Sequence, residues 1–410
     1  MQYCWRATIV AMSICMLMMP NALAISAVEL GDGFRITETD LGLEGVAIDP
    51  VGESVLIYGN DAYIRYLDAQ DPSIQIELLW PSSKNINDAD FHPGGQTAFL
   101  VGEEGMVLRY AKQDHSVEKA ASESSLMFSD ISSVAWNTAG DWAYVGSTNG
   151  EIWRLRADAN GSAEVHVIVG AGDGSIESMD CHRTIRMCVV ASTVNGIGVI
   201  DRDHVLSWVG GTGYVWNGIN CPSGNSNVCI AIAENQNIAT IYLNPNDISM
   251  SKPEINTLTG LDSFFVGIEN QDGDRSLIAT IPASLIEHDS LLDASFPWLE
   301  NNDVEDIELT SGRIIGTWTT GVDSGWIITN RGYVVSFAPP PDDSAGLLSI
   351  WIALAIPLAM GMVVLSLVYS SSSRLQDWTV KRFGSKKSRK EITVKDRKLA
   401  RAKKSKKYRK

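Results

Sequence analysis

Short apolar runs that end in turns recur along most of the chain. Seven such runs can be aligned, each with residues typical of a β-strand followed by a Gly, Pro, Asn or Asp turn. They begin at Gly45, Asp88, Ser133, Ser178, Gly218, Val266 and Asp306, so successive starts are 40 to 48 residues apart. Self-similarity at a near-constant spacing indicates one supersecondary unit repeated seven times.

The third unit shows its strands most clearly. "SSVAWN", "WAYVGS", "IWRLRA" and "EVHVIV" each have β-strand composition, and Asn149-Gly150 between the second and third marks a tight hairpin. No unit carries an amphipathic helical pattern. The sequence therefore predicts an all-β domain of seven four-stranded units, although longer turns obscure strands around Asn244–Thr259 and Ile281–Leu299.

The last unit lacks a clear fourth strand. It has strands in "WIITN" and "YVVSF", but no further strand before Ala338. The segment Phe34–Leu41 precedes the first unit, and we expect it to supply the missing strand. Such sharing would close a ring of units and remove its open edges.

The pattern resembles the seven-bladed β-propeller superfamily of WD40-like and YVTN-like repeats, over roughly Phe34 to Phe337. The strand–turn pairs "IDPVGES" and "FHPGGQT" and the hairpins "GEEGMVLRY" and "TNGEIWRLRA" carry the resemblance. The third strands end "YLD", "RYA" and "RLR" rather than in Trp-Asp, so the match is to the architecture. It implies a ring that binds through the end built from loops between blades and from the hairpins joining second and third strands.

Those loops and hairpins hold aromatic and acidic side chains suited to protein or glycan recognition. The candidates for a binding face are Trp80, Glu103, Glu104, Met127, Tyr214, Trp216 and Trp298. The competing interpretation is that many of these side chains belong to the core.

Cysteine positions indicate an oxidising compartment. Cys4 and Cys15 lie in the N-terminal segment, which leaves Cys181, Cys188, Cys221 and Cys229 for the repeat region. An even number suggests two disulfides, with three pairings formally open. In the resembled fold, each successive pair flanks a first-to-second-strand turn, so we predict Cys181–Cys188 and Cys221–Cys229. No CxxC motif or histidine cluster indicates a zinc site.

The two ends of the chain predict membrane insertion. Residues 1–24 read as a signal peptide with an apolar run and a small-x-small end at Ala22-Leu23-Ala24, the alternative being an uncleaved anchor. Residues 25–337 would form the propeller ectodomain and 338–345 a Pro/Asp linker. Residues 346–369 contain no charge and are long enough for a transmembrane helix.

Charge sets the expected orientation. Residues 370–410 carry 17 Lys and Arg against three acids, whereas the part before them, without Arg6, carries 15 basic and 46 acidic residues. Positive segments stay cytoplasmic, so we expect a single-pass cell-membrane protein with its N-terminal domain outside. The basic tail is predicted to be disordered and to contact anionic lipid. The acidic surface expected for the ectodomain argues against nucleic acid as its partner.

No catalytic signature stands out. The chain has no HExxH, GxSxG or P-loop motif, and His92 occupies the turn position that Asp49, Asn137 and His182 fill in other units, which favours a solvated turn residue. The stretch Asn270–Ser276 resembles a calcium loop only faintly, and Asn160 is the one glycosylation sequon. We expect no catalytic residue, metal or cofactor. The function expected is a scaffold near the membrane that binds membrane or cell-surface proteins, or glycans. The alternative is a propeller-type hydrolase or lyase acting at the central mouth of the ring.

Overall fold

The computed structural model describes residues 26–37, 39–157, 163–224, 227–304, 308–340, 361, 369, 371–383 and 386–407. The chain separates into two compact units, Met1–Pro339 and Pro340–Lys410.

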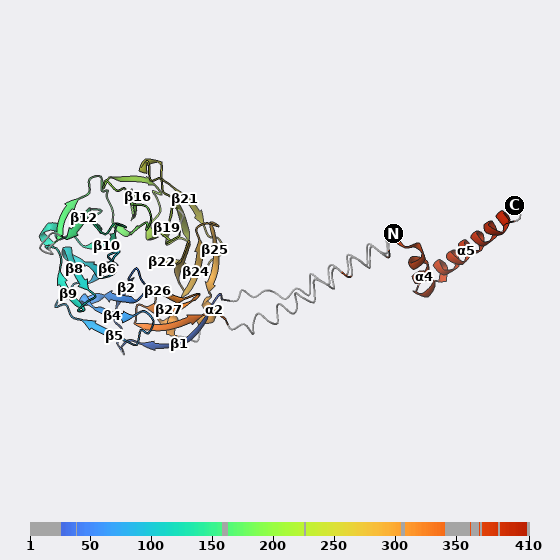
Figure 1. Ribbon diagram of the computed structural model, residues 1–410, viewed down its shortest axis with the longest axis horizontal. Helices are drawn as coiled ribbons and strands as arrows, with labels where there is room; N and C mark the ends of the chain where they lie inside the picture. Colours follow the sequence, from blue (N-terminus) through green and yellow to red (C-terminus); the bar gives the residue numbers. More distant parts are fainter. Residues whose placement is uncertain are drawn as a thin grey trace. The chain divides into compact units, whose positions relative to one another are not determined.

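The first unit is a ring of seven four-stranded antiparallel sheets, the blades (Figure 1). Blade 1 contains β2 (Leu43–Ile48), β3 (Ser54–Gly59), β4 (Ile64–Asp68) and β5 (Gln75–Leu78). Blade 2 contains β6 (Ile86–Phe91), β7 (Thr97–Gly102), β8 (Met106–Ala111) and β9 (Ser116–Lys119). Blade 3 contains β10 (Ile131–Trp136), β11 (Ala143–Ser147), β12 (Ile152–Ala157) and β13 (Ala163–Val167). Blade 4 contains β14 (Ile176–Cys181), β15 (Cys188–Ser192), β16 (Gly196–Ile200) and β17 (Leu206–Gly210).

The remaining blades follow the same order. Blade 5 contains β18 (Trp216–Asn220), β19 (Val228–Ala233), β20 (Asn237–Tyr242) and β21 (Lys252–Thr257). Blade 6 contains β22 (Phe264–Asp272), β23 (Arg275–Ile281), β24 (Ser284–Asp289) and β25 (Ala294–Leu299). Blade 7 contains β26 (Ile314–Gly321), β27 (Ser324–Thr329), β28 (Tyr333–Ala338) and β1 (Glu29–Arg35). Short helical turns in the loops are η1 (Asn60–Ala62), η2 (Glu103–Gly105), η3 (Glu123–Leu126), η4 (Ile248–Met250), α2 (Asn301–Val304) and η5 (Glu308–Ser311). The predicted all-β seven-bladed propeller is confirmed.

Strand β1 closes the ring, as expected, but it lies earlier in the sequence than Phe34–Leu41. It pairs antiparallel with β28, from Glu29 opposite Ala338 to Arg35 opposite Tyr333. The threonines that follow form a local turn instead, in which the Thr37 hydroxyl donates to the Thr39 carbonyl at 3.0 Å. The N-terminal and C-terminal ends of the propeller therefore share one blade.

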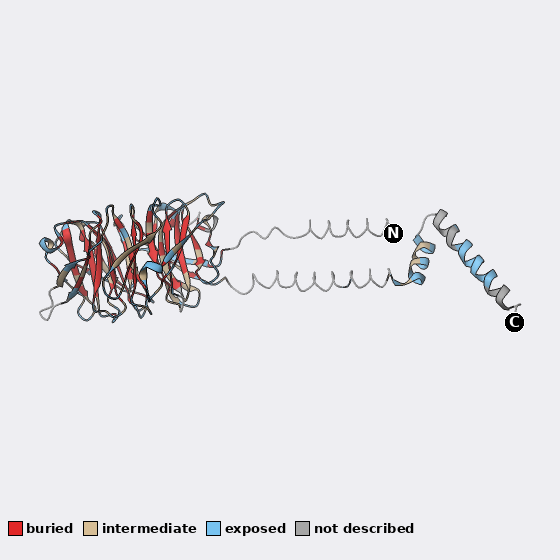
Figure 2. Cartoon of the chain, turned by 90° about the horizontal axis from the view of Figure 1, so that it is seen from above, coloured by how far each residue is buried: buried red, intermediate tan, exposed pale blue. Residues whose placement is uncertain are grey.

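Burial divides each blade into layers (Figure 2). The second strand of each blade is covered by neighbouring blades on both faces and is largely buried, whereas third strands such as β4 and β12 also carry Arg. Every residue of β3 and of β19 is buried, for example. The outermost strands, such as β9 and β21, are largely exposed and carry alternating charge. In the innermost strands, some side chains pack between neighbouring blades and others point into the central channel.

Every innermost strand has a bulge near its start. In β2, for example, the register shifts between Leu43 and Gly45. The residue after the bulge is Gly45, Asp88, Ser133, Ser178, Gly218, Gly267 or Gly316 in blades 1 to 7. At two of these positions a side chain would collide with a neighbour: a Cβ on Gly45 would lie 2.2 Å from the hydroxyl of Tyr58 in the adjacent strand, and one on Gly316 2.6 Å from Val46 Cγ2 in the next blade. Of the residues after the bulge, only Asp88 is larger than serine, and it faces the centre of the ring.

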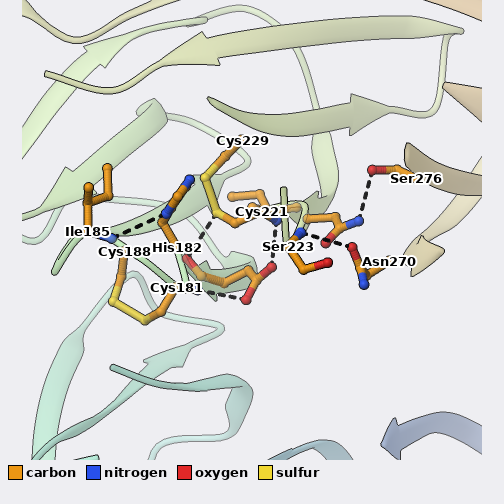
Figure 3. The surroundings of a disulfide bond; sticks show 12 residues. Cys181, His182, Ile185, Cys188, Cys221, Ser223, Cys229, Asn270 and Ser276 are labelled. Atoms are coloured by element: carbon orange, nitrogen blue, oxygen red, sulfur yellow. Dashed lines mark hydrogen bonds between the residues drawn. A yellow bond between two sulfur atoms is a disulfide. The ribbon is translucent and has the colours of Figure 1, made fainter. Parts of the chain in front are cut away.

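Two disulfides close first-to-second-strand turns in adjacent blades, as predicted (Figure 3). Cys181 and Cys188 are bonded and directly opposed in the β14–β15 ladder. Cys221, which follows β18, is bonded to Cys229 in β19. Both bonds lie at the end of the ring opposite the second-to-third-strand hairpins.

The second unit contains α4 (Ser373–Phe383) and α5 (Lys386–Lys407). The expectation of a disordered basic tail was therefore wrong. Lys, Arg, Leu, Ala and Gln dominate these segments and all favour helix, which outweighs mutual repulsion. Among the described residues, no helix is long and apolar enough to cross a membrane. The predicted signal peptide, and all of residues 346–369 except 361 and 369, lie outside the described residues.

Candidate functional site

The inner strands enclose a central channel with a volume of about 610 Å³. Its wall is polar, because alternate residues of the seven strands turn toward it. Seven acidic residues line it, and burial raises the pKa to about 6 to 8 for four of them, on alternate blades: Asp88 and Asp90 from blade 2, Asp180 from blade 4 and Glu269 from blade 6. The sequence analysis did not identify this cluster.

Asp88 is the most extensively bonded of the four. Its Oδ1 accepts from the Tyr58 hydroxyl at 3.0 Å and from the Ala89 N–H at 2.8 Å, and its Oδ2 accepts from the Val134 N–H at 2.8 Å. Burial raises its pKa from 3.8 to about 7 despite these three donors, with a smaller contribution from the charge of Asp180. Asp88 is therefore held in place whether or not it carries a proton.

Asp90 and Asp180 occupy equivalent positions in their strands. Asp90 Oδ2 accepts one bond, from the Trp136 N–H at 2.7 Å, and burial raises its pKa to about 8. Asp180 accepts from the N–H groups of Cys181 at 2.7 Å and Cys221 at 2.6 Å. These two donors and the charge of nearby Arg183 oppose the effect of burial, so the pKa of Asp180 rises only to about 6.

Glu269 has the least support. No hydrogen bond to its carboxyl group is found among the described residues, and burial raises its pKa to about 8, with smaller contributions from the charges of Asp88 and Asp180. A carboxyl group in this situation is largely protonated at neutral pH. Glu269 thus presents a neutral acid to the channel.

The channel acids connect successive blades. An innermost strand has one free edge, whose N–H groups need acceptors. Asp88 and Asp90 satisfy the N–H groups of Val134 and Trp136 in the next blade. In blade 4, Asp180 accepts from Cys221, and Ser178 Oγ accepts from Ile219 N at 3.0 Å in the same way. Three of the four acids, Asp88, Asp90 and Asp180, thus have a structural role, because each accepts hydrogen bonds that join two blades.

Within the part of the chain that the structure describes, no group of three or more His, Cys, Asp or Glu residues is arranged to hold a metal ion. The acids converge on the channel, as a central-mouth enzyme would require, but their bonds to backbone N–H groups occupy most of their oxygen atoms.

The predicted binding-face residues divide into exposed and buried groups. Glu103 accepts from the backbone and side-chain nitrogens of Asn85 at 3.0 and 3.1 Å, and Glu104 forms an ion pair with Lys84 at 3.0 Å. Both lie in the short η2 turn, so they brace the neighbouring loop. Trp80 packs partly buried against the core between blades 1 and 2.

The aromatic candidates behave differently from one another. Trp216 is fully buried and donates its indole N–H to the Gly211 carbonyl at 2.7 Å, with the Tyr214 ring half-exposed beside it. Trp298 is also buried, packed edge-on against Phe337 at 4.8 Å between ring centroids. A partner cannot reach these two tryptophans, which corrects their assignment to a binding face. Trp216 is the first residue of β18, at the start of blade 5, and Trp298 lies near the end of β25, at the end of blade 6.

Met127 is the most exposed candidate. Its side chain and that of its neighbour Phe128 are each 64% exposed. Both residues adopt left-handed backbone conformations, with φ of 57° and 53°. The sequence analysis identified Met127 but missed Phe128. The signal that could have found Phe128 is its place next to Met127 in the same loop.

His92 and the calcium-like stretch have structural explanations. His92 accepts from the Gly94 N–H at Nδ1, so its Nε2 carries the proton and donates to the Gly140 carbonyl at 2.9 Å. The calcium-like stretch is the β22–β23 hairpin, with Asp272 opposite Arg275. Asn160 lies outside the described residues.

Ring and site together define the class: a seven-bladed β-propeller with an acid-lined channel. The fold is similar to that of the Myceliophteria thermophila Cps50 (Swd1) β-propeller domain. The two share 9% sequence identity over 76% of this chain and 100% of that one, with a TM-score of 0.60. No family model matches the sequence, and no curated protein matches it significantly.

Proposed function

We propose that this chain is a single-pass membrane protein whose extracytoplasmic propeller binds a protein partner. The hairpin face, defined as the end of the ring carrying η1, η2 and η3, is the proposed contact surface. The observation that carries the proposal is the exposed Met127-Phe128 pair on that face.

The pair is held out by a well-anchored loop. Leu126 beside it is fully buried, the Phe128 N–H donates to the Glu123 carbonyl at 3.1 Å, and the Gly105 N–H donates to the Ser129 carbonyl at 2.7 Å. Left-handed conformations at two consecutive non-glycine residues cost about 1 kcal/mol or more each. Two large apolar side chains exposed on an anchored loop with backbone strain support a role in recognition, because such residues dominate protein interfaces.

Sequence features support the location. The uncharged segment 346–369 and the strongly basic tail after it favour a membrane anchor with the propeller outside. The two disulfides agree with an oxidising compartment.

Capture of partners from membranes tests the contact surface. The double variant M127S/F128S of the full chain should recover its cross-linked partner with roughly tenfold lower yield, since two apolar anchors are lost. The matched control is L291S/L292S, which changes a second consecutive pair, each 68% exposed, in the β24–β25 turn at the opposite end of the ring. Equal partner recovery by both double variants would exclude the hairpin face as the contact.

Membrane anchoring has its own test. After extraction of membranes with alkaline carbonate, the full chain should stay in the pellet, and a variant lacking 346–369 should be released. Added protease should digest the basic tail, but not the propeller, in inside-out vesicles. Release of the full chain by carbonate would refute the anchor without bearing on the propeller's partner.

A further inference from the structure

A second cavity, of about 390 Å³, opens between blades 2 and 3, away from the central channel. Phe99 in β7 and Arg109 in β8 line one side, and Trp136 in β10 and Arg156 in β12 line the other. The two blades are joined in the wall of the cavity, where the Ala163 N–H donates to the Ala120 carbonyl at 2.9 Å. Its volume is that of a pocket for a small ligand.

The floor of this interblade cavity is aromatic. The Phe99 and Trp136 rings lie 4.7 Å apart with an interplanar angle of 32°, and His92 meets Trp136 edge-on at 4.9 Å. Trp136 is only 8% exposed, yet its indole nitrogen has no hydrogen-bond partner among the described residues. This nitrogen is shielded from solvent, so the cavity floor offers a ligand the faces of the rings rather than the indole N–H.

Two cations lie at the rim. Arg109 uses Nη1 to bond Glu118 at 2.8 Å, and Arg156 uses Nε to bond Glu164 at 2.8 Å. Each guanidinium retains further N–H donors. Both side chains are substantially exposed, and they reach the same cavity from adjacent blades. Asp141, the acid among the lining residues, accepts from its own turn through Asn137 Nδ2 at 2.7 Å.

An arginine bonded to a glutamate across two outer strands is not itself a site. Blade 1 has the same arrangement, in which Arg65 bonds Glu77 at 2.9 Å. Arg65 does not line either cavity. What distinguishes blades 2 and 3 is that two such arginines and an aromatic floor adjoin one cavity.

We propose that the interblade cavity binds a small aromatic carboxylate, free or at the end of a peptide. The ring would pack on Phe99 and Trp136, and the carboxylate would accept from Arg109 and Arg156. This site is separate from the hairpin face and goes beyond the proposed partner contact.

Calorimetric titration of the intact chain in non-ionic detergent with phenylacetate is the test. We expect saturable binding with a Kd on the order of 1 mM, as suits a ligand of this size. Phenethylamine, which has the same ring and the opposite charge, should not bind. A short peptide ending in phenylalanine, with and without an amidated C-terminus, distinguishes a free acid from a chain end: tighter binding of the unblocked peptide than of phenylacetate assigns the chain end.

Single variants locate the site. R109Q and R156Q should each weaken phenylacetate binding roughly tenfold, because each removes a charge-assisted bond. W136F should weaken it less, since the aromatic surface stays. The control R65Q should bind as the unchanged protein does. The proposal fails if phenylacetate shows no saturable binding, if phenethylamine binds equally well, or if R65Q weakens binding as much as R109Q.

Discussion

The channel acids should make the propeller more stable in mild acid than at neutral pH. Burial raises the pKa of Asp90 from 3.8 to about 8, so the folded state keeps a proton that the unfolded state releases. Stability from this group is present in full below pH 3.8 and is lost as pH rises through the window up to about 8. Asp88, Asp180 and Glu269 shift in the same direction.

The magnitude follows from linkage. Between about pH 5 and pH 8, one such group changes stability by at most about 4 kcal/mol, at 1.36 kcal/mol per pH unit. The channel has room for water, which screens the charge, so we expect about 2 kcal/mol from Asp90. The four acids interact, and their contributions therefore do not simply add.

The variant D90N isolates this effect. Asparagine keeps an oxygen for the Trp136 N–H but cannot ionise, so D90N should lose less stability than the unchanged protein as pH rises. Urea midpoints followed by tryptophan fluorescence at each pH measure the difference. The control is D201N, because Asp201 likewise accepts backbone N–H bonds, two in its case, but lies in the exposed β16–β17 turn. If D90N and D201N show the same pH dependence of the urea midpoint, the assignment to Asp90 is wrong.

Two further predictions concern contacts between and within blades. Lys112 bonds the fully buried Asp49 carboxylate of the preceding blade at 2.7 Å, so K112M should destabilise the ring by about 3 kcal/mol, seen as a lower urea midpoint. The pKa of Asp49 is lowered because bonds from Lys112 and from backbone N–H groups outweigh burial, so its contribution is lost in acid and the K112M defect should shrink as pH falls toward 3. Replacing Cys181 and Cys188 by serine should lower stability by about 2 kcal/mol, measured as a lower melting temperature. Because the variant has already lost this bond, reductant should lower its melting temperature less than that of the unchanged protein.

The sequence was a good guide to features that depend on neighbouring residues. Repeated strand–turn patterns predicted the blades, and cysteines flanking one turn predicted the disulfides. The ring closure was also predicted, although β1 begins five residues before the expected segment. The basic tail was misjudged because its charge was weighed against folding while its helix-forming composition was not.

The channel cluster could not be predicted in the same way. Asp88 and Glu269 belong to different blades, and only the geometry of the closed ring brings both to the channel. A local signal did exist: "DAD" places two acids at alternate positions of an innermost strand, where the third blade has serine and alanine. The interblade cavity could not be predicted for the same reason. Within its own blade, each arginine is an ordinary cross-strand partner of a glutamate, and only the packing of blade 2 on blade 3 brings the two arginines to one cavity.

Closure by β1 has a consequence for how the molecule is made. Arg35 pairs with Tyr333, so the first strand leaves the ribosome roughly 300 residues before its neighbour, a wait of about 15 to 60 s at ordinary rates of synthesis. During that interval β1 has no partner strand, and the incomplete ring has two open edges to which other chains can add. The chain is therefore most exposed to misassembly in the time before blade 7 is complete. Chains truncated before Tyr333 lack the partner of β1, so their propeller cannot close.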